Sequence, residues 1–186
     1  MQKVCLFFLS FNMFSWMVPN CGFADGVCVN NMATLDCVKN NFNEAYVYDY
    51  KNFWKIINSS GEKAVMCNKS DDLTNFMRLI EVRKSSNAEF EEYYSQTIEK
   101  VCVENDKCFF EAMTQLSPGA QISIVKLLKA PLFQDTSLIF NVFLHNKNNK
   151  KYKKLADLYF KPELSKPVNK PSGLWARFKR LINVGE

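Results

Sequence analysis

The sequence predicts an all-α protein: a compact bundle of six or seven helices, stapled by disulfides. Apolar residues recur at intervals of three and four along most of the chain, as on one face of a helix. Helix start signals also recur, whereas alternation of period two reaches strand length only at residues 61–67. Five cysteines follow the N-terminal leader and are candidates for these disulfide bonds.

Residues 1–24 are predicted to be a signal peptide. Lys3 precedes an uncharged, Phe-rich run over residues 4–18, and the small residues beyond it favour cleavage before Asp25. The alternatives are an uncleaved anchor, a buried N-terminal helix, and a lipoprotein modified at Cys21. The expected destination is the periplasm or the extracellular space.

Export makes the cysteines disulfide candidates before they are metal ligands. After cleavage of the leader, those left are Cys28, Cys37, Cys67, Cys102 and Cys108. Five cysteines allow two bridges and one leftover thiol, and the pairing of the first three stays open. With no C-x-x-C pair and a single histidine, no metal site is predicted.

A disulfide is predicted between Cys102 and Cys108. On a continuous helix their α-carbons would lie about 9 Å apart, given a rise of about 1.5 Å per residue. Because a disulfide tolerates only about 7 Å, the helix must break between them. The polar residues 104–106 suit a break, and Asp106 is expected to cap the next helix.

The first half of the domain is expected to contain two helices and the only plausible strand. Apolar residues over 42–57 trace one helical face, and Gly61 is expected to end that helix. Residues 61–67 read as a short strand. A second helix is expected to begin at Ser70, where two aspartates follow at the positive end of the helix dipole.

Five further helices are predicted before residue 160. A capping box over residues 86–89 begins one, and another follows the break at residues 104–106. The Ser-Pro pair at 117–118 begins the next, Asp135 caps a fourth, and apolar residues mark a last core helix over 152–159. The helical domain is therefore expected to span residues 25–160.

The chain ends in two segments of different composition. Residues 161–173 contain three prolines among lysines and are predicted to form a linker. Residues 174–186 form an amphipathic segment. Its apolar face is expected at Leu174, Trp175, Phe178, Leu181 and Ile182, and its basic face at Arg177, Lys179 and Arg180. We expect this segment to contact a partner protein; the alternatives are an anionic membrane surface, the domain itself, and a mobile tail.

The residue types that commonly act in catalysis do not form a recognisable active-site motif in this sequence. His145, the only histidine, is interpreted as a helix-end residue, and Glu89, Glu91, Glu92 and Glu99 as a solvated helix face. No nucleophile motif, phosphate loop or dinucleotide fingerprint occurs, so no catalytic residue or cofactor is expected. The formal net charge of +5 is too modest to indicate nucleic-acid binding.

These features favour an exported, non-catalytic protein-binding module, for example an inhibitor or an immunity-type protein. The alternative is a carrier of a small apolar ligand or lipid, and an enzyme with an unrecognised site ranks third. Exposed apolar surface would favour the binding module, an enclosed apolar cavity the carrier, and buried paired acids the enzyme.

Overall fold

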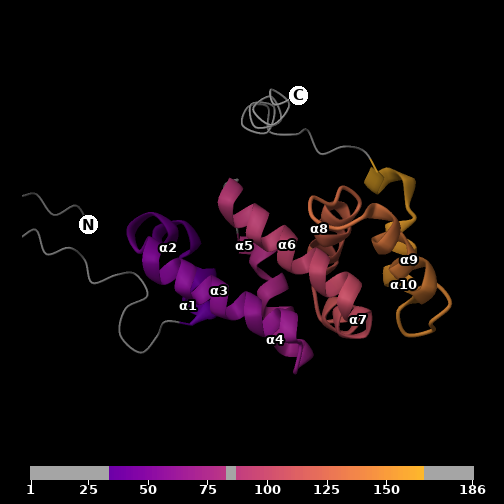
Figure 1. The fold of residues 1–186 in the computed structure, drawn as a ribbon, viewed down its shortest axis with the longest axis horizontal. Coiled ribbons are helices and arrows are strands. Elements are labelled where there is room, and N and C mark those ends of the chain that lie inside the picture. The colour runs from indigo at the N-terminus through magenta and orange to yellow at the C-terminus, as the bar shows by residue number, and fades with distance from the viewer. Residues whose placement is uncertain (1–33, 83–86, 166–186) are drawn as a thin grey trace, which may run out of the picture.

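The computed structural model describes residues 34–82 and 87–165 (Figure 1). Over these ranges the chain is helical and has no strand, so the all-α prediction is confirmed. The helices are more numerous and shorter than expected. In chain order they are α1 (Leu35–Asn40), α2 (Phe42–Tyr48), α3 (Tyr50–Met66), α4 (Ser70–Met77), α5 (Leu79–Val82), α6 (Ala88–Glu104), α7 (Asp106–Thr114), α8 (Pro118–Leu128), α9 (Thr136–Asn146), α10 (Lys153–Tyr159) and the 3₁₀ helix η1 (Pro162–Ser165).

Helix α6 lies between the two halves of the described fold (Figure 1). It contacts α3 on the N-terminal side and both α7 and α9 on the C-terminal side. Helix α4 packs on α3 and α7, and α10 packs on α8 and α9. Helices α4 and α6 thus join the aromatic-rich first half to the later helices of the described residues.

The core of the described residues is rich in phenylalanine. Phe42, Phe53 and Phe90 form edge-to-face ring pairs between α2, α3 and α6. A second ring cluster joins α7, α9 and α10, where Phe143 stacks on Tyr159 with centroids 4.4 Å apart. Such pairs add about 0.5–1.5 kcal/mol each beyond the burial of their area.

The predicted helix over residues 42–57 is in fact two helices, and the predicted strand at 61–67 is wrong. The chain breaks at Asp49, and α3 then runs through Gly61 to Met66. Gly61 does not end the helix: a Cβ there would lie 2.9 Å from Tyr93 Cε1, so glycine is needed for close packing with α6. The helix ends at Cys67, which adopts the left-handed conformation with φ 46°.

Two of the predicted caps are confirmed and two are displaced by one residue. Ser117 Oγ accepts a hydrogen bond from Ala120 N ahead of Pro118, and Asp135 accepts one from Ser137 N. Asn87 caps α6 through Phe90 N, which places the start one residue later than the capping box predicted. Asn105, and not Asp106, caps α7 through Cys108 N.

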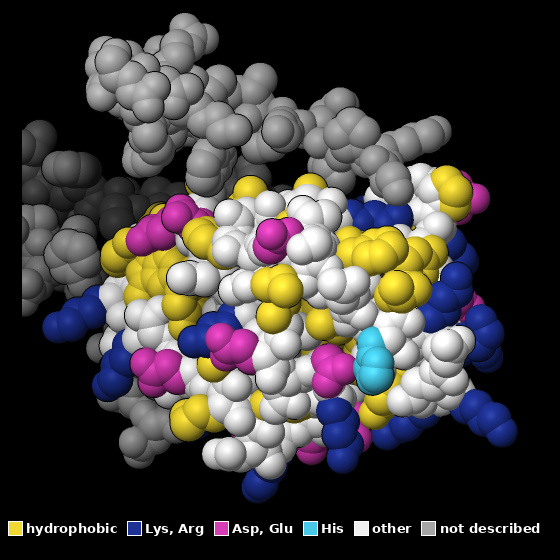
Figure 2. All heavy atoms as spheres, turned by 45° about the vertical axis from the view of Figure 1, so that its right-hand side comes forward, with side chains coloured by type: hydrophobic (Ala, Val, Ile, Leu, Met, Phe, Trp, Pro, Cys, Tyr) yellow, Lys and Arg dark blue, Asp and Glu magenta, His cyan; other side chains and the backbone are white. Residues whose placement is uncertain are grey.

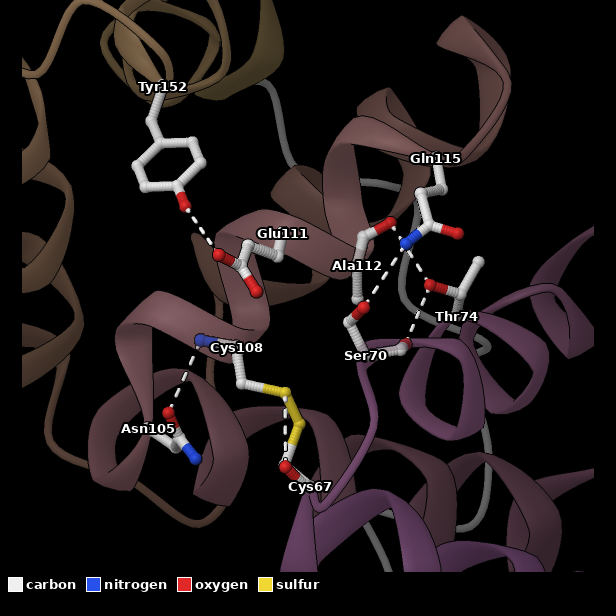
Figure 3. The surroundings of a disulfide bond; sticks show 9 residues. All are labelled: Cys67, Ser70, Thr74, Asn105, Cys108, Glu111, Ala112, Gln115 and Tyr152. Atoms are coloured by element: carbon white, nitrogen blue, oxygen red, sulfur yellow. Dashed lines mark hydrogen bonds between the residues drawn. A yellow bond between two sulfur atoms is a disulfide. The ribbon is translucent and has the colours of Figure 1, made fainter.

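The predicted pairing of Cys102 with Cys108 is wrong. Cys108 forms a disulfide with Cys67, with α-carbons 6.5 Å apart (Figure 3). Cys102 is free and buried. Cys37 is disulfide-bonded as well. The helix does break at Asn105 as the spacing argument required, but the break points Cys108 toward the turn after α3. Local spacing could not show that α3 and α4 bring Cys67 within reach.

Several predictions fall wholly or partly outside the described residues. The signal peptide at 1–24 and the amphipathic segment at 174–186 lie outside them, and so does most of the linker. The first part of that linker is described and is ordered: Pro162–Ser165 forms η1, which packs against α8. No helix in the described ranges is long and apolar enough to span a bilayer.

Candidate functional site

One short stretch of the chain carries most of the exposed large apolar side chains. Of nine such residues in the described ranges, five fall between positions 132 and 144. We call them the α9 apolar surface, and each is between 40% and 55% exposed: Leu132, Phe133, Leu138, Phe140 and Leu144. Figure 2 shows exposed apolar side chains gathered near the single histidine, His145, which lies in the last turn of α9.

The loop that leads into α9 is held by a buried carboxylate. Glu99 of α6 has no exposed surface. Its Oε1 accepts a hydrogen bond from Leu132 N at 2.9 Å, and its Oε2 accepts from Phe133 N at 2.8 Å and from Gln134 N at 2.9 Å. Three successive amides that converge on one anion form a backbone nest, so the negative charge is stabilised where it is buried. The interpretation of Glu99 as part of a solvated face is therefore wrong.

The two ends of α9 are fixed as well. Asp135 accepts a hydrogen bond from Ser137 N at 2.7 Å, and that bond lowers the pKa of the Asp135 carboxyl. At the other end, Asn146 Nδ2 donates to Asp106 Oδ2 at 3.0 Å and joins α9 to α7. The loop is thus held to α6 through Glu99 and the end of α9 to α7 through Asp106, while Asp135 caps the start of α9.

The α9 apolar surface has two sides. Ile139 and Phe143 point into the core. Phe140 and Leu144 are four residues apart and share one side of the helix, next to α10. Leu138 is two residues from Phe140 and so lies about 200° away around the helix axis. One side therefore carries Phe140 and Leu144, and Leu138 lies on the other.

The hydrogen bonds to Glu99 hold the backbone of the loop and so determine where its side chains are presented. Leu132 and Phe133 stay exposed while their own amides are bound to Glu99. Moving this stretch of backbone would leave the buried carboxylate without its donors, which costs about 1–3 kcal/mol per unmade bond. The loop therefore presents two large apolar groups in a fixed backbone arrangement.

Two hollows lined by described residues are both open to solvent. One lies beside Phe42, Tyr46 and Glu89, and the other lies between the start of α1 and the outer face of α3. Neither is an enclosed apolar cavity of the kind a lipid carrier needs.

The other side chains that could act in catalysis or metal binding have structural explanations. Glu89 accepts hydrogen bonds from Tyr50 at 2.8 Å and from Tyr46 at 3.3 Å, and its bond with Tyr50 raises the pKa of that phenol. Burial raises the pKa of the Cys102 thiol well above its usual range, which disfavours the nucleophilic thiolate. Among the described residues, no group of three His, Cys, Asp or Glu side chains is arranged to hold a metal ion.

The structure brings together few of the residues that the sequence singled out. The C-terminal contact residues (Leu174, Trp175, Arg177, Phe178, Lys179 and Arg180) lie outside the described ranges, and His145 is exposed at a helix end as expected. Sequence reasoning missed the loop surface and its support by Glu99. The available signal was the pair Leu132-Phe133 between Pro131 and Asp135, two large apolar residues where a polar loop is the rule.

No known family model matches the chain, and neither curated proteins nor solved structures gave a significant match.

Proposed function

We propose that this protein is an exported, non-catalytic protein-binding module of the inhibitor or immunity type. It would bind its partner through the loop residues Leu132 and Phe133 together with Leu138 on the adjoining first turn of α9. The observation that carries this proposal is the loop itself: two large apolar side chains are exposed on a backbone fixed by a buried carboxylate.

The energetics of association favour such a loop. Protein interfaces depend on a few buried anchors, and aromatic residues are common among them. Full burial of an exposed Leu or Phe side chain contributes about 1.5–3 kcal/mol, and these side chains, which are 40–55% exposed, would gain about half of that each. Ordering a flexible loop costs part of that gain, and a loop that is already held by three hydrogen bonds avoids much of this cost.

The disulfide is compatible with the proposed location. Cys67–Cys108 joins the turn after α3 to the first turn of α7, and bridges of this kind persist in oxidising compartments. The export signal predicted at residues 1–24 supports the same location. The two open hollows give less support to the alternative of an apolar-ligand carrier.

The test is affinity capture by the exported protein from an extract of its own host, followed by calorimetry with the retained protein. Phe133→Asp should abolish retention or weaken binding by at least about tenfold, which corresponds to about 1.4 kcal/mol. Val47→Asp is the matched control, because Val47 is 63% exposed on α2, far along the chain from the loop. Equal binding by wild type and Phe133→Asp would show that the loop is not the binding surface.

A further inference from the structure

We infer that residues 174–184 of this chain dock on the Phe140–Leu144 side of α9 and cover it in the free protein. This inference goes beyond the proposed function and does not depend on it, because it concerns the other side of α9. Leu132, Phe133 and Leu138 remain free for a partner.

The described chain ends beside this side of α9. The Phe160 ring follows α10 and packs edge-to-face on Phe140, with centroids 5.6 Å apart. Lys147 Nζ lies 4.9 Å from the Phe160 ring centroid, so this corner is already occupied by the end of α10. Helix η1 follows at once and packs on α8 up to Ser165. The described chain therefore ends five residues after the contact between Phe160 and Phe140.

The remaining chain has the length to return to α9. Residues 166–173 separate η1 from the amphipathic segment and include Pro167 and Pro171. At about 3.1 Å per residue, eight extended residues span up to about 25 Å. Helix α9 has 11 residues and is only about 16 Å long. The extended tether is thus longer than α9 itself, which is enough to bring the segment back from η1 to the neighbouring helix.

The two surfaces complement each other. Apolar residues of the segment recur at positions 174, 175, 178, 181 and 182, which gives a helix one apolar face and leaves its three basic residues for water. A helix of about 11 residues is marginal alone and needs that face covered. Phe140 and Leu144 are 42% and 47% exposed and are four residues apart, so they form a ridge on which such a face can pack.

The tether favours this occupant over a separate molecule. A second protein would lose translational and rotational freedom on binding, which costs at least about 4 kcal/mol. A segment joined by eight residues is instead present at an effective concentration in the millimolar range. Modest apolar contact is therefore enough to hold the chain's own segment on α9.

Tryptophan fluorescence of the whole protein tests the inference without any partner. In a Trp16→Phe/Trp54→Phe variant, Trp175 is the only tryptophan left. Its emission should be blue-shifted and protected from acrylamide quenching relative to a peptide of residues 170–186. Adding Phe140→Asp should shift the emission and the quenching to the values of the peptide, and Leu144→Asp should do the same. Val47→Asp, on α2, should change neither.

The alternatives give different results. Trp175 emission identical to that of the free peptide would overturn the inference, as would protection that survives both α9 substitutions. Protection that grows with protein concentration would assign the contact to a second copy, and protection that appears only with anionic phosphatidylglycerol vesicles would assign it to a membrane; either would overturn it. Far-UV circular dichroism of each variant shows that loss of protection is not loss of the fold.

Discussion

Replacing Glu99 by glutamine should release the loop that leads into α9. The side chain keeps its shape, but one carboxylate oxygen becomes an amide nitrogen, which cannot accept a hydrogen bond. The better orientation retains the bonds from Phe133 N and Gln134 N to one oxygen and leaves Leu132 N facing another donor.

The magnitude follows from these three bonds. A hydrogen bond to a charged group contributes about 1.5–3 kcal/mol, and the two that remain weaken when the charge is removed. We expect Glu99→Gln to lower the free energy of unfolding by about 2–4 kcal/mol, which is compatible with a folded protein of ordinary stability. At this chain length the loss corresponds to a fall in Tm of roughly 5–15 °C.

Two measurements check the prediction. Urea unfolding followed by circular dichroism gives the free energy, and hydrogen exchange reports the amides of Leu132, Phe133 and Gln134, which should lose protection before the rest of α9. Glu92→Gln is the matched control, because Glu92 is exposed on the same helix, and it should change stability by no more than about 0.5 kcal/mol. A comparably small loss for Glu99→Gln, with exchange at the three amides unchanged, would refute the role assigned to the carboxylate.

Three further predictions follow from the fold. Replacing Cys67 and Cys108 by serine should destabilise the protein by about 4 kcal/mol, because the bridge spans 41 residues and restricts the unfolded chain; peptide mapping without reduction checks the pairing. Cys102 should not react with a thiol reagent at neutral pH until the protein is unfolded in denaturant, because burial raises the pKa of its thiol; prompt labelling of the native protein would contradict this. Gly61→Ala should destabilise the protein by about 1–3 kcal/mol despite the higher helix propensity of alanine, because the new methyl group displaces Tyr93. In a Tyr93→Leu background, thermal melting should show that the same change costs much less.

Local chemistry explains why much of the secondary structure could be predicted from the sequence. The hydroxyl of Ser117, with proline after it, and the carboxylate of Asp135 satisfy helix amides within three residues, so no distant contact is needed to form those starts. The break near Asn105 was also predictable, since polar residues there compete with helical hydrogen bonding. One-residue errors in the capping residue arose where two adjacent side chains can each serve as the cap.

The apolar pattern of the chain by itself determined that this protein is an all-α domain, because helical periodicity and caps act over a few residues. Only the tertiary structure decided the pairing of Cys67 with Cys108, the passage of α3 through Gly61 and the burial of Glu99. Each of these depends on a partner about 30 to 40 positions away: Cys108 for Cys67, Tyr93 for Gly61, and the amides of residues 132–134 for Glu99. A glycine that stops a helix and one that admits a neighbouring ring look alike in the sequence, as do a solvated glutamate and one that binds a loop. The difference lies in which helix packs against them.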